Sequence, residues 1–261
     1  MRIATLDDTN RAEAVAFLRR SPYRNALPLS NATQLHARCD VYIALQEQRV
    51  VGVVSSYRDL PFLNLTFATS RDDALAPLVD ALASQNPQMR CKPLTTLVPR
   101  ERRDALARIA TIEDARVEYQ MVVEPESLRS INGHEPRRLN AADLPQLNEL
   151  ASRAALTTWH PSMLELGPAF GCFVGTQLVA MAATHFATPD VVEIGHIATD
   201  PAYRRRGYAS ACICALTQAA FRLSPRVFLM VLAENTPALE AYRRLGFFPI
   251  EPFYLTTFSL L

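Results

Sequence analysis

A basic turn, a glycine and small residues stand together where the sequence predicts that a helix begins. Three arginines, Arg204–Arg206, precede Gly207, and the small residues Ala209 and Ser210 follow it. The first turn of a helix carries backbone N–H groups without intrahelical partners and the positive end of the helix dipole. A glycine lets phosphate oxygens approach these groups, because no Cβ stands in the way. The pattern predicts a pyrophosphate site over Arg204–Ser210, and the alternative is a solvated basic turn before an ordinary helix.

Composition and absent motifs narrow the classes of function. The chain has 27 Lys and Arg against 26 Asp and Glu, a net charge of +1, so no whole-molecule field draws it to nucleic acid or an anionic membrane. It contains neither G-x-x-x-x-G-K-[ST] nor G-x-G-x-x-G, which disfavours nucleotide hydrolysis and nicotinamide binding. The five cysteines lack C-x-x-C spacing, and His160, His185 and His196 lack metal-ligand spacing, so no metal site is expected.

The expected location is the cytoplasm. No stretch approaches the roughly 18 apolar residues of a membrane span. The first residues, Met1–Asp8, lack the apolar run of a signal peptide, and scattered cysteines suit a reducing compartment. We therefore expect no membrane partner.

The basic turn lies between a strand and a helix in the C-terminal half. Asn140–Asp143 is a helix-start signal, and apolar residues continue at helical spacing to about Thr158. Two apolar runs around Gly175 predict a β-hairpin. The expected strands are Phe170–Val174, Leu178–His185, Val191–Thr199, Arg226–Leu232 and Phe253–Leu261, and the later helices are Gly207–Phe221 and Pro237–Leu245.

The N-terminal half repeats this order of elements. Its expected helices and strands are Asp8–Arg20, Val41–Leu45, Val50–Tyr57, Phe62–Ala68, Asp72–Ala83, Leu94–Val98, Arg100–Ile109 and Val117–Val123. A polar, Pro-punctuated segment separates the halves. We expect an α/β (α+β) protein with domains at 1–125 and 137–261, joined by a linker at 126–136. Each domain is expected to hold a twisted mixed or antiparallel sheet flanked by helices.

Two motifs give the sequence a specific resemblance. Arg204-Arg205-Arg206-Gly207-Tyr208-Ala209 resembles the [QR]-x-x-G-x-[GA] signature of the GNAT N-acetyltransferase superfamily. Asn235, Tyr242 and Leu245-Gly246-Phe247 resemble the second C-terminal block of that family. The resemblance covers 136–261 well and the N-terminal half only in architecture, so the chain resembles a tandem GNAT protein with a degenerate first half.

The resemblance implies a sheet that splays open after its fourth strand. It also implies an enzyme that uses acetyl-CoA as co-substrate and needs no metal. The pantothenyl arm would lie along the fourth strand and the pyrophosphate on the basic turn. The implied coenzyme-binding residues are Ile197, Ala198, Thr199, Arg204, Arg205, Arg206, Gly207, Tyr208, Ala209, Ser210 and Asn235. Asn235 can instead cap the helix that follows it.

Acylating an amine requires a base, an oxyanion donor and an acid. Glu193, eleven residues before Arg204, resembles the glutamate base of some GNAT enzymes, and an ion-paired strand residue is the alternative. His196 on the same strand is the competing base. The resemblance implies that Tyr242 donates a proton to the coenzyme sulfur, unless it is a core tyrosine, and that the Ile197 N–H holds the oxyanion. For the acceptor wall the candidates are Trp159, His160, Met163 and Glu165, which loop packing explains better.

The N-terminal half has no such site by sequence. At the equivalent place Asp72 and Asp73 occupy the first helical turn, where they suit capping and would repel a pyrophosphate. The expected function is transfer of an acetyl group from acetyl-CoA to a primary amine of a small molecule, peptide or protein. The alternative is a non-catalytic acyl-CoA-binding sensor or scaffold. The identity of the acceptor, the acyl-chain preference and the oligomeric state are not encoded in these patterns.

Overall fold

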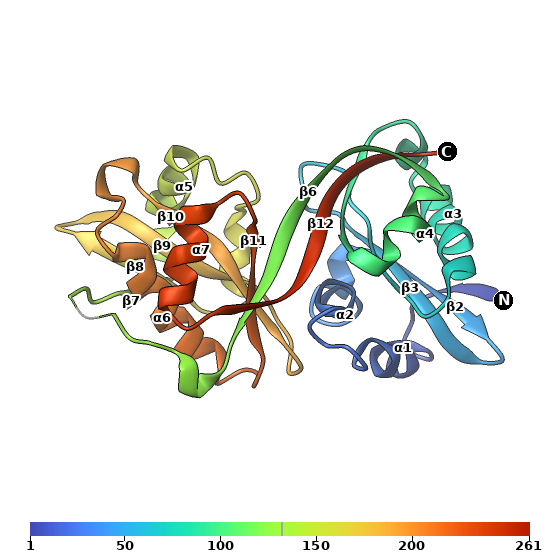
Figure 1. Cartoon of the computed structure of the whole chain (residues 1–261), viewed down its shortest axis with the longest axis horizontal. Helices are drawn as coiled ribbons and strands as arrows, with labels where there is room; N and C mark the ends of the chain where they lie inside the picture. Colours follow the sequence, from blue (N-terminus) through green and yellow to red (C-terminus); the bar gives the residue numbers. More distant parts are fainter. Residues whose placement is uncertain (132) are drawn as a thin grey trace. The chain divides into compact units, whose positions relative to one another are not determined.

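The computed structural model describes residues 1–131 and 133–261, and its contacts divide the chain into two units (Figure 1). The first comprises Met1–Glu118 and Glu251–Leu261, and the second comprises Tyr119–Ile250. The expected linker falls in the second unit, and its residue Asn132 lies outside the described residues. The final strand groups with the first unit, which differs from the expected boundary, because a strand pattern does not reveal which sheet the strand joins.

The first unit is built on an antiparallel sheet in the order β1-β2-β3-β4. These strands are β1 (Arg2–Thr5), β2 (Cys39–Gln46), β3 (Arg49–Tyr57) and β4 (Thr66–Thr69). The helices are α1 (Arg11–Leu18), α2 (Ala26–Ala32), α3 (Leu75–Gln85) and α4 (Arg103–Ala107). Strand β5 (Leu94–Pro99) pairs antiparallel with β12 (Phe248–Leu260), and β6 (Ala110–Val123) and β12 each contribute residues to both units.

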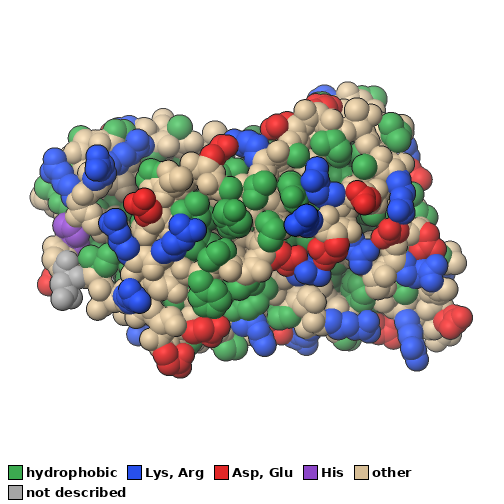
Figure 2. All heavy atoms as spheres, in the orientation of Figure 1, with side chains coloured by type: hydrophobic (Ala, Val, Ile, Leu, Met, Phe, Trp, Pro, Cys, Tyr) green, Lys and Arg blue, Asp and Glu red, His purple; other side chains and the backbone are tan. Residues whose placement is uncertain are grey.

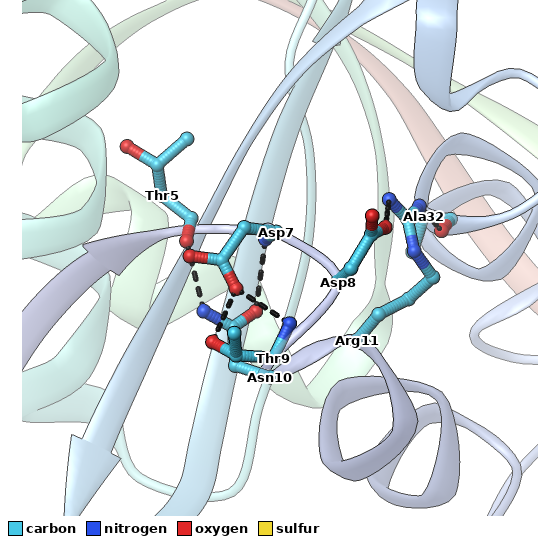
Figure 3. Close-up of polar contacts among 7 residues, drawn as sticks. All are labelled: Thr5, Asp7, Asp8, Thr9, Asn10, Arg11 and Ala32. Atoms are coloured by element: carbon cyan, nitrogen blue, oxygen red, sulfur yellow. Dashed lines mark hydrogen bonds and ion pairs between the residues drawn. The ribbon is translucent and has the colours of Figure 1, made fainter.

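The helix expected near Asp8–Arg20 is α1, which is shorter at both ends, and an additional helix, α2, follows it. Asp7 Oδ1 accepts hydrogen bonds from the backbone N–H and the hydroxyl of Thr9 at 2.9 and 2.6 Å (Figure 3). The Asp7 N–H donates to Asn10 Oδ1, so a turn precedes α1 and delays its start. Helix α2 escaped prediction because it has only seven residues and its first turn contains Pro28, which is tolerated there but gives no helix signal.

The second unit has the sheet order β6-β11-β10-β9-β8-β7. Its strands after β6 are β7 (Arg137–Arg138), β8 (Ala169–Val174), β9 (Gln177–Ala187), β10 (Val192–Thr199) and β11 (Val227–Leu232). Its helices are α5 (Leu144–Arg153), α6 (Tyr208–Ala220) and α7 (Thr236–Arg244). The element order therefore repeats that of the first half, as expected. The expected extension of α5 to Thr158 is wrong, because Ala155 takes a positive φ of 55° and ends the helical path.

Both faces of β9 are buried in this unit. Ala180 and Ala182 pack into a cluster with residues of α6, α7 and β11. Met181 and Ala183 pack with residues of α5. Since successive strand side chains point to opposite faces, the helices cover the sheet on both sides. Strand β9, which pairs with β10, is therefore packed on both faces.

The surface carries charges of both signs. Lys and Arg side chains are interspersed with Asp and Glu on the face shown in Figure 2, in line with the net charge of +1. Among the described residues, the helices include none with the length and apolar character needed to cross a bilayer.

Candidate active site

The sheet of the second unit opens between two parallel strands. The ladder between β10 and β11 contains only the pairs Val192↔Val227 and Glu193↔Phe228, at the start of both strands. Beyond Glu193 strand β10 continues to Thr199 without a register partner on β11. The pairing between the two strands therefore ends at Glu193, and the main chain of β10 beyond it has no ladder with β11.

Strand β10 is irregular where it passes this opening. Its register with β9 shifts between Glu193 and Ile194 and again between Gly195 and Ala198. Within the second irregularity His196 has a φ of +46°, which is rare for a residue with a side chain and typical of a bulge that redirects side chains. Ile197 lies in the same bulge and has no register partner on β9.

The bulges let Glu193 and His196 share one neighbour although they are three residues apart. His185 on β9 lies with its Nδ1 3.0 Å from Glu193 Oε1, and its ring centroid lies 5.1 Å from that of His196. Glu193 and His196 are only 5% and 7% exposed. His185 carried no site signal in the sequence, because its role depends on the pairing of β9 with the irregular β10.

Three buried polar atoms of this cluster have no partner. Glu193 Oε2 and both ring nitrogens of His196 make no hydrogen bond within the described structure. Burial, helped by the neighbouring His185, lowers the pKa of His196 to about 3, so its imidazole is neutral at physiological pH. Unsatisfied buried polar groups are costly, and they are concentrated at functional sites.

A tryptophan borders the cluster. The rings of Trp159 and His196 meet edge to face with their centroids 5.7 Å apart, and the Trp159 indole N–H donates to Asn148 Oδ1 at 2.9 Å. Trp159, one of the residues expected as candidates for the acceptor wall, thus contacts His196, the competing candidate for the base. His160 instead caps the short 3-10 helix Pro161–Glu165 through Ser162, and Met163 is buried.

The basic turn adopts a conformation that glycine favours. Gly207 has a φ of +87° and forms the N-cap of α6, and Arg205 also has a positive φ, of 63°. Two of the three arginines have local partners: Arg204 Nε donates to the Thr199 carbonyl at 3.4 Å, and the Arg206 guanidinium lies 5.5 Å from the Tyr203 ring centroid. All three arginines are exposed, so their charge is available to an anion at the start of α6.

A residue of the expected linker packs on this turn. His134 Nε2 lies 2.6 Å from the Arg206 carbonyl oxygen, and the His134 ring lies 4.0 Å from that of Tyr208. A Cβ built on Gly207 would lie 3.5 Å from the His134 ring. The sequence offered no sign of this contact, because the two partners of the hydrogen bond are 72 residues apart.

The other predicted site residues lie on α7 and along β10. Tyr242 is 8% exposed and packs in the cluster that also contains Val192 and Ile194, and burial raises the pKa of its phenol to about 12. Asn235 caps α7 by accepting from the Ala238 N–H at 3.3 Å. Ala198 and Thr199 pair with β9 on one side and face the opening on the other.

The corresponding place in the first unit is occupied by ion pairs. Asp72 contacts Arg102 and Arg108 at 2.8 and 3.2 Å, and Asp73 pairs with Arg71. The first helical turn there thus carries acidic groups already matched by arginines. Across residues 1–131 and 133–261, no group of three His, Cys, Asp or Glu side chains is placed to hold a metal ion.

Comparisons with known proteins agree with this geometry. Residues 137–247 match the Acetyltransferase (GNAT) family. A Drosophila protein of known structure is similar with a TM-score of 0.71 and 16% identity, covering 99% of this chain and 98% of that one. A tandem GNAT protein from the clavulanic acid biosynthesis pathway gives a TM-score of 0.67 and 13% identity, covering 99% and 98%. A GCN5-related N-acetyltransferase from Sphaerobacter thermophilus gives 0.66 and 13%, covering 99% and 95%.

A search of curated proteins finds no match. The low identities to the solved structures show the fold alone, whereas the family match covers the segment that holds both sequence motifs and the open sheet edge. Residues 137–247 thus match the Acetyltransferase (GNAT) family, and the whole chain shares its fold with solved structures that include a tandem GNAT protein.

Proposed function

We propose that the chain is an N-acyltransferase that moves an acetyl group from acetyl-CoA to a primary amine of a small molecule, peptide or protein. The observation that carries the proposal is the end of the β10–β11 ladder at Glu193. One buried carboxylate thus stands where the sheet opens, and the open edge of β10 leads to the glycine-capped start of α6.

The residues present fit the coenzyme. Main-chain groups of Ile197–Thr199 along the open edge would bind the pantothenyl arm, much as a neighbouring strand would. The backbone N–H groups that begin at Gly207, together with Arg204–Arg206, would bind the pyrophosphate, because this turn combines unpaired donors with positive charge. Bound there, acetyl-CoA supplies an activated thioester. Asn235 contributes by capping α7.

The proton steps are assigned to two side chains. Glu193 accepts a proton from the acceptor amine, so that the nitrogen lone pair is free to attack. The Ile197 N–H, in the bulge of β10, donates to the developing oxyanion. Tyr242, whose pKa of about 12 keeps it protonated, donates to the departing thiolate. His196 is a weaker candidate for the base, because its pKa of about 3 makes it a poor proton acceptor near neutrality.

A thiol-release screen tests the proposal directly. Purified full-length protein is mixed with acetyl-CoA and a library of primary amines, and free thiol is followed over time. In parallel, coenzyme A is titrated calorimetrically into the protein. Saturable coenzyme binding with amine-dependent thiol release is the expected result, and absence of coenzyme binding contradicts it. Tight coenzyme binding without acylation of any amine would instead identify a sensor or scaffold.

A further inference from the structure

Two buried cysteines of the second unit face each other where α6 packs on the sheet. Cys172 on β8 and Cys212 on α6 are 2% and 0% exposed, and their sulfur atoms lie 3.5 Å apart. Both are free thiols, and the proposed acyl transfer uses neither of them. The sulfur atoms of a disulfide lie about 2.05 Å apart, so a combined displacement of about 1.5 Å would join this pair.

The hydrogen bond between the two thiols makes them chemically unequal. Cys212 donates its S–H to Cys172 Sγ, which lowers the pKa of the Cys172 thiol. The same bond, together with burial, raises the pKa of the Cys212 thiol. Because the thiolate is the nucleophilic form of cysteine, Cys172 is the member of the pair that reacts first with an oxidant. Cys212 then contacts the oxidised sulfur and can attack it.

Burial restricts the oxidants that can reach these sulfur atoms. Thiol–disulfide exchange needs direct contact between the two sulfur centres, because it proceeds through a mixed disulfide. Glutathione disulfide is too large to make that contact with a side chain that is 2% exposed, as Cys172 is. Hydrogen peroxide is close to water in size. The exposed Cys91, by contrast, is open to both reagents. The buried pair therefore selects a small hydroperoxide.

Cys172 also connects the pair to the turn that carries the proposed coenzyme site. Its S–H donates to the Tyr208 carbonyl oxygen at 3.6 Å, and Tyr208 is the first residue of α6, directly after Gly207. A disulfide has no S–H, so this contact is lost on oxidation. The shorter distance between the sulfur atoms also draws α6 toward β8, whose register is already irregular between Cys172 and Phe173. Oxidation therefore displaces the backbone N–H groups at the start of α6.

We propose that Cys172 and Cys212 form a dithiol site that a hydroperoxide oxidises to a disulfide, and that this disulfide weakens coenzyme binding at the start of α6. The Cys172 thiolate attacks a peroxide oxygen, the O–O bond breaks, and the departing hydroxide takes up the thiol proton and becomes water. The Cys212 sulfur attacks the resulting sulfenic acid, the S–O bond breaks, and the hydroxyl leaves with the Cys212 proton as a second water. Two thiols lose two electrons in total, and one peroxide gains them.

Alkylation and peptide mapping test the modification itself. Full-length Cys91→Ser, which lacks the exposed thiol, is treated with hydrogen peroxide or with glutathione disulfide, then denatured and alkylated. The chain has five cysteines, so four remain in this variant. Peroxide should leave two of the four unalkylated, in one peptide pair that links Cys172 to Cys212. Glutathione disulfide should leave all four open to alkylation. Four alkylated cysteines after peroxide, or a link between any other pair, overturn the site.

A matched control separates this pair from buried thiols in general. Cys214 also lies on α6 and is buried, and burial raises the pKa of its thiol. Cys214→Ser in the Cys91→Ser background should form the same link between Cys172 and Cys212. Cys172→Ser in that background should form no disulfide. Thermal unfolding verifies each variant, and Cys212→Ala replaces Cys172→Ser if the latter does not fold. A disulfide in these link-deficient variants would contradict the assignment.

Calorimetry tests the effect on coenzyme binding. Acetyl-CoA is the titrant, because the free thiol of coenzyme A would itself react with a disulfide. Peroxide treatment of Cys91→Ser should raise the Kd about fivefold or more, since a lost hydrogen bond and displaced donors both weaken binding. The link-deficient variant should keep its affinity after the same treatment. A linked protein with unchanged Kd, or an equal loss of affinity in the link-deficient variant, overturns the coupling.

The two measurements keep this inference distinct from the proposed function. The coupling to the coenzyme rests on the proposed coenzyme site, whereas the disulfide does not. If the untreated protein fails to bind acetyl-CoA, the proposed function is rejected, and the peptide map still decides whether the dithiol site exists. If acetyl-CoA binds but peroxide forms no link, the dithiol site alone is rejected.

Discussion

His134 Nε2 and the carbonyl oxygen of Arg206 lie 2.6 Å apart, and this contact joins the expected linker to the turn before α6. The turn contains two residues with positive φ, Arg205 and Gly207, so it needs external support to keep its shape. His134 supplies that support through a hydrogen bond and through its ring contact with Tyr208. The turn that we propose as the pyrophosphate site is therefore supported by two distant parts of the chain.

Replacing His134 should weaken coenzyme binding. His134→Ala removes the bond to Arg206, and a typical net value of about 0.5–1.5 kcal/mol predicts a two- to tenfold rise in the Kd for coenzyme A, measured calorimetrically. His134→Gln keeps a side-chain donor and should recover part of the loss. His36→Ala in the first unit is the control. Tighter binding by His134→Ala would mean that the imidazole competes with the phosphates.

The affinity for coenzyme A should depend on both the size and the charge of the side chain at position 207. Gly207→Ala places a Cβ at a φ of +87°, which costs about 1–2 kcal/mol of stability. Gly175→Ala, in the β8–β9 turn with a φ of 57° and open space around it, is a control with similar strain. Only the Gly207 variants should lose affinity for coenzyme A, and Gly207→Asp should lose most because its carboxylate repels phosphate. Equal coenzyme affinity in Gly207→Asp and wild type would rule out the pyrophosphate site.

Tyr242→Phe should separate catalysis from binding. The variant keeps the buried ring but loses the hydroxyl, so kcat for thiol release should fall about 10²- to 10⁴-fold while the Kd for coenzyme A stays within about twofold. Because the phenol pKa is about 12, its ionisation should leave no mark on the wild-type rate between pH 6 and 9. Tyr254→Phe, in the first unit, should keep full activity. Undiminished kcat in Tyr242→Phe would exclude the phenol as the acid.

His196 should make the fold sensitive to acid. Its folded pKa of about 3 lies below its ordinary value of 6.5, so the unfolded chain binds one more proton between these limits. The contribution of neutral His196 to the free energy of unfolding is fully present above pH 6.5 and is lost as pH falls toward 3. Between pH 7 and 5 the loss is about 2 kcal/mol. Urea unfolding at pH 7, 6 and 5 measures it. His196→Gln should show a flatter dependence of the free energy of unfolding on pH, and parallel curves for variant and wild type would contradict the assignment.

One coenzyme should bind per chain. Asp72 and Asp73 stand at the helix start in the first unit and are paired with arginines, so a pyrophosphate there would meet negative charge. Calorimetry should give a stoichiometry of one, and Asp72→Asn should leave the Kd unchanged. Two equivalent sites, or a site abolished by replacing Asp72 with lysine, would reverse this view of the first unit.

Local signals in the sequence were sufficient for the elements that depend on neighbouring residues. Asn140 and Asp143 form the capping box that begins the segment before α5, and Gly207 ends the basic turn at the start of α6, both at the predicted positions. Such features arise from hydrogen bonds and backbone angles within a few residues, so composition and spacing reveal them. The family motifs are of the same kind, since each is a short run whose meaning does not depend on distant contacts.

Only the tertiary structure decided which distant groups meet. His134 reaches Arg206 and His185 reaches Glu193 through chain packing and strand pairing, and a positive φ at His196 overrides the alternation that a regular strand would impose. Strand pairing between distant residues also places most of β12 in the first unit. These outcomes depend on contacts between residues far apart in sequence, whose free energies no local pattern contains. The sequence by itself thus determined most of the elements and the glycine at the start of α6, whereas packing determined the polar cluster at the opening of the sheet.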